Sequence, residues 1–370
     1  MEELETMLNS AFSDGASDVI YQVGQPVIKK IQGRLVPQGD IVKTESEIQE
    51  IIQKVAGNKC LSDNTKTDYD CSYQVPSGRL RVNIGYEKGN PFIFFRLIPA
   101  NVPEFSSLGL PVEILSLSEN KRGIVLVTGP VGMGKSTTLA SMIKHIVTHQ
   151  QRCIITLEDP IEFVYENTPT KSLILQREIG RDVPDFATGL RQALRENPDI
   201  ILVGEMRDRD TVESAFNAAL SGHLVLGTVH TISSVQTVDR LVSLFPESLH
   251  PDARMQLSLS LKGIVAQALL PRKDGNGRIP CVEFLPIVSD DIRKFIREGT
   301  PQKIRQFIEI KSKTGAYPFD IYLARLVLDG FVSEDVAIEF AQEPDTIMQK
   351  ITRVSEETNP THTASWKKNF

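Results

Sequence analysis

Residues 129–136 have the composition and spacing of a phosphate-binding loop. They read GPVGMGKS and fit the pattern G-x-x-x-x-G-K-[ST]. Glycines let the backbone curl so that its N–H groups point at a phosphate. Lys135 would then reach the β- and γ-phosphates of a nucleotide, and the Ser136 hydroxyl would ligate Mg²⁺.

The flanking residues support this interpretation over an ordinary glycine-rich turn. An apolar run at 124–127 precedes the loop and a helical pattern at 136–147 follows it, so a bound anion would lie at a helix N-terminus. The sequence therefore predicts a site for ATP with Mg²⁺. Its predicted members are Gly129, Pro130, Val131, Gly132, Met133, Gly134, Lys135, Ser136 and Thr137.

Acidic residues follow two further apolar runs. Residues 199–205 read DIILVGE and end in Glu205. In P-loop enzymes a strand beside the loop carries an acidic residue that holds Mg²⁺ or its water, at the end where parallel sheets bind ligands. We therefore expect Glu205 and Ser136 to form the metal site.

The other acidic segment, TLEDPIEF at 156–163, places three carboxylates after one run: Glu158, Asp159 and Glu162. Carboxylates this close repel one another, which suits a neighbouring metal or a water to be deprotonated. The alternative is a polar loop in which Pro160 ends the strand.

Two histidines flank a fourth apolar segment, GHLVLGTVH at 222–230. In a regular strand, seven residues of separation put His223 and His230 on opposite faces, so they are not expected to share a metal. The functional interpretation is a sensor that hydrogen-bonds the γ-phosphate or the acidic cluster. The alternative is a pair of structural histidines.

The elements that must position these residues follow from hydrophobic patterning. Short β-branched runs at 124–127, 153–157, 200–203 and 224–229 alternate with longer helical patterns, which is typical of a parallel sheet covered on both faces. Residues 252–342 are expected to be mostly helical. We assign residues 121–345 to this α/β domain and residues 346–370 to a loose or partner-ordered polar tail.

The N-terminal part has a different pattern. A helix at 2–13, a capping box at Thr44 and Glu47, and strands at 19–23, 27–36, 79–86 and 92–98 predict a small α+β domain over residues 1–100. Prolines at 99, 103 and 111 mark residues 101–120 as an interdomain linker.

Composition excludes several classes of protein. The 370 residues predict two domains at about 150 residues each. Lys and Arg number 41 and Asp and Glu 47, and the net charge of −6 argues against nucleic-acid binding. The four cysteines form no C-x-x-C pair, and no apolar stretch approaches the roughly 18 residues of a membrane span. We therefore expect a cytoplasmic protein without direct membrane insertion.

The four segments, in this order, resemble the secretion-ATPase superfamily, the motors of type II secretion, type IV pili and some type IV secretion systems. The resemblance is closest to the type IV pilus retraction ATPases. It rests on the phosphate loop, the acidic box at 157–163, the Walker B strand at 199–208 and the histidine box at 222–230. Shorter matches are GASDV at 15–19, RLRVN at 79–83, FFRLIP at 94–99 and DIRKFIREG at 291–299.

This resemblance implies a RecA-like P-loop ATPase core, a smaller N-terminal α+β (PAS-like) domain and a helical C-terminal part. It implies a homohexamer that hydrolyses ATP to power pilus retraction, hence pilin disassembly and twitching motility. Such a motor works at the cytoplasmic face of the inner membrane through a platform protein, and other pilus motor subunits are further candidate partners. The alternatives are a type IVB secretion ATPase or another motor of the superfamily, a non-hydrolysing regulatory subunit, and a nucleic-acid motor.

The resemblance also implies roles for individual residues. Glu162 would be the general base that orients the attacking water, with Glu158 in the same acidic box. Glu205 would hold the Mg²⁺-bound water, and His230 and His223 would couple phosphate state to the subunit interface. Four arginines are further candidates: Arg81 and Arg96, which would swing onto the nucleotide from the N-terminal domain, and Arg195 and Arg207, which flank the Walker B strand.

Overall fold

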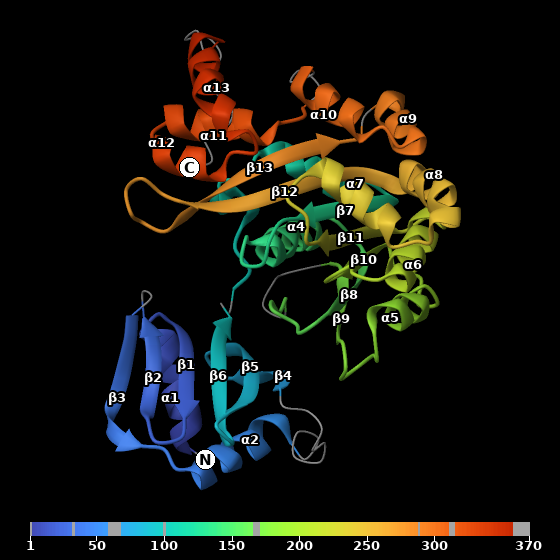
Figure 1. The fold of residues 1–370 in the computed structure, drawn as a ribbon. Helices are drawn as coiled ribbons and strands as arrows, with labels where there is room; N and C mark the ends of the chain where they lie inside the picture. Colours follow the sequence, from blue (N-terminus) through green and yellow to red (C-terminus); the bar gives the residue numbers. More distant parts are fainter. Residues whose placement is uncertain are drawn as a thin grey trace. The chain divides into compact units, whose positions relative to one another are not determined.

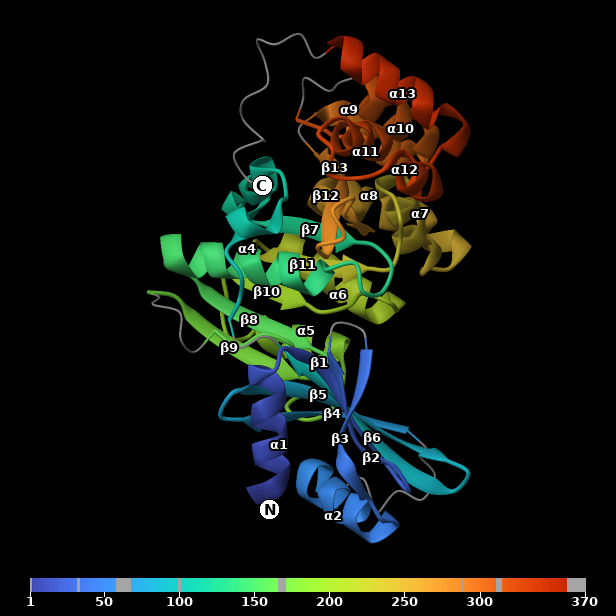
Figure 2. The same cartoon turned by 90° about the vertical axis from the view of Figure 1, so that its left-hand side faces the viewer.

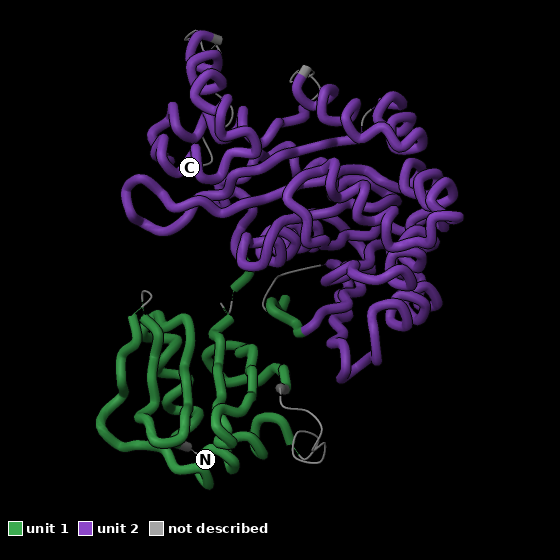
Figure 3. The backbone as a smooth tube through the Cα atoms, in the orientation of Figure 1, with its two compact units in different colours: residues 1–102, 160–166 green, residues 103–159, 167–370 purple. Residues whose placement is uncertain are grey.

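The structure is a computed structural model that describes residues 2–31, 34–57, 68–98, 101–165, 171–287, 289–310 and 315–357. The chain folds into two compact units (Figure 3). Unit 1 comprises residues 1–102 and 160–166, and unit 2 comprises residues 103–159 and 167–370. The short segment at 160–166 thus belongs to unit 1, although the sequence analysis placed it within the ATPase domain.

Unit 1 is an α+β fold, as predicted. Its sheet has the strand order β3-β2-β1-β6-β5-β4, and neighbouring strands are antiparallel (Figure 1). The elements are α1 (Glu2–Ser13), β1 (Ala16–Gln22), β2 (Pro26–Ile31), β3 (Arg34–Val42), α2 (Glu45–Ala56), β4 (Asp68–Val75), β5 (Gly78–Glu87) and β6 (Asn90–Ile98).

Hydrophobic alternation explains how the two helices pack on this sheet. Along β5, Leu80, Val82 and Ile84 are buried and alternate with partly exposed residues. These side chains share one core with Leu8 of α1 and Ile48 of α2. The predicted capping box is confirmed at the start of α2, where the Thr44 N–H donates to the Glu47 carboxylate at 2.8 Å.

Unit 2 contains the predicted parallel sheet. Its strand order is β13-β12-β7-β11-β10-β8-β9, with every neighbouring pair parallel except the β12–β13 hairpin. The strands are β7 (Gly123–Thr128), β8 (Cys153–Glu158), β9 (Leu173–Glu178), β10 (Ile200–Val203), β11 (Leu224–Val229), β12 (Leu261–Pro271) and β13 (Arg278–Pro286).

Helices cover both faces of this sheet (Figure 2). The first helices are α4 (Lys135–His149), α5 (Phe186–Ala193), α6 (Arg209–Leu220), α7 (Ser234–Ser243), η3 (Glu247–Leu249) and α8 (His250–Ser260). The later helices are α9 (Asp290–Glu298), α10 (Pro301–Ile310), α11 (Phe319–Leu328), α12 (Glu334–Phe340) and α13 (Pro344–Glu357). Within the described residues, no helix is both long and apolar enough to cross a membrane.

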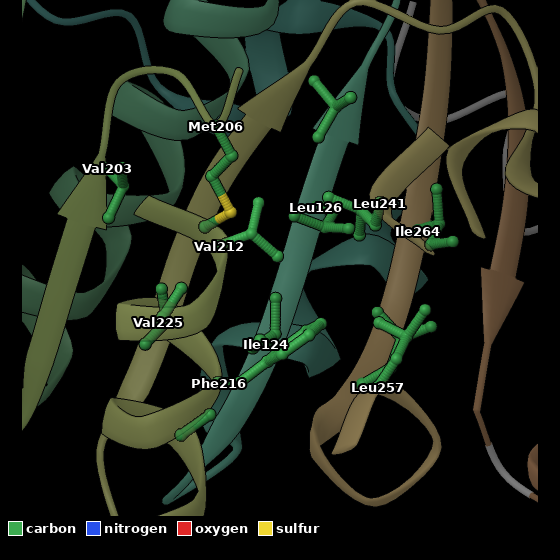
Figure 4. Close-up of a cluster of buried hydrophobic side chains, with 14 of the residues drawn as sticks. Ile124, Leu126, Val203, Met206, Val212, Phe216, Val225, Leu241, Leu257 and Ile264 are labelled. Atoms are coloured by element: carbon green, nitrogen blue, oxygen red, sulfur yellow. The ribbon is translucent and has the colours of Figure 1, made fainter. Parts of the chain in front are cut away.

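A cluster of buried hydrophobic side chains lies on one face of the sheet (Figure 4). Ile124 and Leu126 of β7 contribute to it together with Phe216 of α6 and Leu257 of α8. All residues of β7 and β11 are buried, because each strand lies in the middle of a sheet that is covered on both sides.

Three expectations were wrong in part. The expected linker instead contains η1 (Phe105–Leu108) and η2 (Val112–Glu119), whose apolar side chains are buried in unit 2. The region expected to be mostly helical also contains β12 and β13, whose apolar residues are buried on both faces and so show no alternation. The first part of the expected tail is helix α13, in which the Lys350 amine donates to the Asp320 carboxylate of α11 at 2.8 Å. Residues 358–370 lie outside the described residues.

Candidate functional site

The predicted phosphate loop connects β7 to α4 and takes a curled conformation. Gly129, Gly132 and Gly134 have φ angles of 147°, 79° and 80°, which side chains rarely allow. At Gly129 an added Cβ would lie 2.3 Å from the backbone oxygen of Gln267, so the close approach of β12 also requires glycine. The loop glycines are therefore used for backbone geometry.

Lys135 is the first residue of α4 and is only 8% exposed. Its Nζ atom donates to the carbonyl oxygens of Gly129 and Pro130, both at 2.9 Å. The amine is thus held on the inner side of the loop, where a phosphate-binding lysine must be. Ser136 and Thr137 follow in the first turn of α4, whose N–H groups and dipole favour an anion.

Strand register brings the other predicted residues to the same edge of the sheet. Thr128 pairs with Val229, and Val203 pairs with both Gly227 and Leu157. Because these strands are parallel, the residues after them all emerge at their carboxyl ends. Among them are the predicted site residues His230 and Glu205, together with Asp159 of the acidic segment.

A continuous line of polar contacts joins these residues in unit 2. The Lys135 Nζ lies 3.2 Å from His230 Nδ1, and His230 Nε2 lies 3.3 Å from a Glu205 oxygen. The other Glu205 oxygen lies 3.1 Å from Arg207, which is also 3.7 Å from Asp159. Since an ammonium is only a donor and a carboxylate only an acceptor, the neutral His230 tautomer that carries its proton on Nε2 satisfies both neighbours.

Glu158 ends β8 beside this line and accepts hydrogen bonds of its own. The Thr156 hydroxyl donates to its carboxylate at 2.6 Å, and the Gln176 amide donates at 3.1 Å. These bonds orient the side chain at the same edge of the sheet.

Other predicted site residues belong to unit 1. Arg81 on β5 pairs with Asp70 at 3.3 Å, and Arg96 on β6 pairs with Asp18 at 3.1 Å. Glu162 lies in the segment at 160–166 and is half-buried. The roles of Arg81, Arg96 and Glu162 at a bound nucleotide remain predictions.

His223 is not brought to the phosphate loop. It precedes β11, at the amino end of the strand, where its Nδ1 lies 3.0 Å from the Ala218 oxygen. The six residues of β11 lie between it and His230, and the seven steps along the strand span about 23 Å at 3.3 Å per residue. Arg195 lies exposed in the turn after α5.

Two residues that the sequence analysis did not identify contact the loop from the β12–β13 hairpin. Gln267, 5% exposed, donates to the Met133 carbonyl at 2.8 Å and accepts from the Thr138 hydroxyl at 2.8 Å. Arg278 donates to the Gly132 carbonyl at 3.2 Å. In the sequence, Gln267 is recognisable only as one amide within an apolar run. That pattern does not indicate a contact with the phosphate loop.

The donor set fits Mg²⁺ bound together with nucleotide. Among the described residues, no three His, Cys, Asp or Glu side chains are grouped so that they could hold a metal alone. Mg²⁺ usually takes one or two protein oxygens and fills its remaining positions with phosphates and waters. Ser136 in the first turn of α4 and Glu205 after β10 are oxygen donors of this kind.

Known proteins resemble this chain in sequence and in fold. Residues 101–308 match the family described as Type II/IV secretion system protein. The chain is 37% identical to the type IV pilus retraction ATPase PilT of Pseudomonas aeruginosa, over 93% of this chain and 99% of that protein.

Two solved structures are also similar. The crystal structure of the pilus retraction motor PilT with bound ADP superposes with a TM-score of 0.85 at 37% identity, over 94% of this chain and 99% of that one. The Legionella pneumophila ATPase DotB gives 0.81 at 32% identity, over 90% and 94%. The predicted α/β ATPase fold and the resemblance drawn from the four motifs are confirmed, and the chain belongs to the Type II/IV secretion system protein family.

Proposed function

We propose that this protein is a motor ATPase that hydrolyses ATP to power type IV pilus retraction. The observation that carries the proposal is the line of contacts from Lys135 through His230 to Glu205, at the carboxyl ends of a parallel sheet. It joins the phosphate loop to the acidic strand end, as a nucleotide hydrolase requires. The similarity to PilT of P. aeruginosa supports the pilus role.

The chemistry follows from the positions of the residues in unit 2. The loop N–H groups and the first turn of α4 would bind the phosphates, and Lys135 would contact the β- and γ-phosphates. Ser136 and, through a water, Glu205 would hold Mg²⁺. When bound, Mg²⁺ supplies positive charge that offsets the charge developing on the transferred phosphoryl group.

Hydrolysis also needs a nucleophile in line with the γ-phosphate. Glu162 would accept a hydrogen bond from the attacking water and orient it as general base, while the water oxygen forms a bond to phosphorus and the bond to ADP breaks. Arg81 and Arg96 would contribute planar guanidinium groups to the phosphates from unit 1. His230 would report the state of the γ-phosphate because it bridges Lys135 and Glu205.

The motor is proposed to act as a homohexamer at the cytoplasmic face of the inner membrane. A pilus platform protein would receive its motion, and other pilus motor subunits would be further partners. ATP binding would draw the two units of a subunit together and hydrolysis would release them, a hinge closure of the kind that many nucleotide enzymes use.

A second candidate function is supported by one comparison. The DotB structure is nearly as similar as the PilT structure, with TM-scores of 0.81 and 0.85. A secretion ATPase would share the same site chemistry, so the two functions differ in the machinery that the motor drives.

One experiment tests the ATPase activity, and a second separates the two functions. Purified wild type should hydrolyse ATP in the presence of Mg²⁺, whereas Lys135→Ala and Glu162→Gln should lose most of the turnover. Deletion of the gene should leave surface pili present and abolish twitching or pilus disassembly. Unchanged pilus dynamics with loss of protein export would overturn the pilus role in favour of secretion, and wild-type turnover in Lys135→Ala would overturn the ATPase itself.

A further inference from the structure

The acidic box is divided between the two units. Glu158 and Asp159 belong to unit 2, at the end of β8, whereas residues 160–166 belong to unit 1 (Figure 3). Glu162 is therefore carried by unit 1, and Lys135 and Glu205 are carried by unit 2. The candidate base and the phosphate loop therefore belong to different units. This division falls within a short segment, because Glu162 is only four residues from Glu158.

One arginine of unit 1 holds the segment that contains Glu162. Arg79 on β5 donates from Nε to the carbonyl oxygen of Ile161 at 2.9 Å. A second nitrogen of the same guanidinium donates to the Ser72 hydroxyl on β4 at 2.7 Å. Because the guanidinium is planar and both of its bonds are short, it links two strands of the sheet to the acidic-box backbone in a fixed direction.

The bonded atom is directly connected to Glu162. The Ile161 carbonyl and the Glu162 nitrogen share one planar peptide unit, so a bond to that oxygen fixes the plane from which Glu162 extends. Ile161, Phe163 and Tyr165 are each 7% exposed, whereas Glu162 and Val164 are half-buried. This alternation is that of an extended segment, in which Glu162 projects away from the side that buries its neighbours.

We propose that Arg79 is a positioning residue that fixes Glu162 to unit 1. The rate of hydrolysis would then depend on the position of unit 1 as well as on bound nucleotide. The inference rests on the proposed function, in which Glu162 is the general base. The phosphate loop of unit 2 would bind the nucleotide whether or not Arg79 is present, whereas the rate of the chemical step would depend on the unit that carries Glu162. Movement of unit 1 would thereby be coupled to turnover.

Steady-state kinetics of Arg79→Met test the proposal. Methionine keeps an apolar stem and removes both hydrogen bonds, and we expect kcat to fall about 10- to 100-fold because a displacement of about 1 Å has effects of this size. The KM for ATP should change less than about twofold. Arg79→Lys should recover part of the loss, Ser72→Ala should give a smaller loss, and Arg34→Met on β3 is the matched control.

A double-mutant cycle separates positioning from general structure. In a Glu162→Gln background, Arg79→Met should change single-turnover rates less than about twofold, since a residue that acts through Glu162 has nothing left to position. An equal loss in both backgrounds, or a raised KM with a lowered Tm, would overturn the proposal. If Arg79→Met does not fold, the same comparison is made with Ser72→Ala and Arg79→Lys.

Failure of the inference and failure of the proposed function give different results. Wild-type turnover in Glu162→Gln would remove Glu162 from the base role, whatever Arg79 variants do. Loss of turnover in Glu162→Gln together with wild-type kcat in Arg79→Met would leave the base role standing and overturn the positioning role alone.

Discussion

The imidazole of His230 lies 3.2 Å from the amine of Lys135, and this contact joins the end of β11 to the start of α4. These residues are 95 positions apart in the chain. The ring's other nitrogen faces Glu205 at 3.3 Å, so one side chain contacts both the cation and the carboxylate of the predicted phosphate site. A group in this position is well placed to respond when a γ-phosphate arrives or leaves.

Substitution of His230 should therefore impair turnover more than binding. We expect His230→Ala to lower kcat about 10-fold or more, the order of effect seen when one polar group beside developing charge is removed. The KM for ATP should change little, because the loop and α4 remain intact. A coupled assay of ATP turnover measures both constants, with His223→Ala, at the opposite end of β11, as a control. Equal losses in the two variants would contradict a role specific to His230.

Gln267 should control the affinity of the phosphate loop. Gln267→Leu leaves the Thr138 hydroxyl and the Met133 carbonyl without the amide, and each buried unsatisfied group costs about 1–3 kcal/mol. We expect the Kd for ATP to rise about 10-fold or more, measured by calorimetry in the Glu162→Gln background to prevent turnover. Thr138→Val removes one of the two bonds and should give a smaller effect. An unchanged Kd in Gln267→Leu would show that β12 does not support the loop.

Two loop glycines should differ in their tolerance of a side chain. At Gly129 an added Cβ would lie 2.3 Å from the Gln267 carbonyl, whereas at Gly132 no atom lies within 4 Å. Gly132→Ala should lower the free energy of unfolding by only about 1–2 kcal/mol, the cost of placing a side chain in a left-handed conformation. Gly129→Ala should in addition push β12 and the loop apart. Thermal denaturation with and without ATP should therefore show a larger loss for Gly129→Ala, and the reverse order would contradict the steric argument.

Glu283 on β13 predicts a dependence of stability on pH. Burial raises the pKa of its carboxyl above the ordinary value of about 4.5, while the Ser234 N–H at the start of α7 donates to it at 2.6 Å and offsets part of that rise. The folded state therefore holds this proton more tightly than the unfolded state. The free energy of unfolding should fall as the pH rises from about 4.5 toward the raised pKa.

Glu283→Gln provides the measurement for this prediction. The amide cannot ionise but keeps an oxygen that accepts from Ser234. Scanning calorimetry between pH 4.5 and pH 8 should show the Tm of the variant increasing relative to wild type as the pH rises. A Tm difference that does not change with pH would mean that Glu283 contributes no titration to folding.

Local features predicted much of the fold correctly. The capping box at Thr44 and Glu47, the glycine spacing of the phosphate loop and the apolar runs at 124–127 and 224–229 each carry their signal within a few residues. The parallel sheet followed from those runs, because strands buried on both faces are continuously apolar. Strands β4 and β9 were missed, since edge strands of mixed polarity resemble loops in sequence.

A curled glycine loop before a helix is a local property of the backbone, so the phosphate loop could be predicted from the sequence. Which distant residues meet the loop depends on the fold. Strand register placed His230 and not His223 beside Lys135, and the β12–β13 hairpin brought Gln267 to the loop. The bond from Arg79 to Ile161 joins the Glu162 segment to unit 1. Such contacts depend on pairing and packing between segments far apart in the chain, which local patterns do not encode.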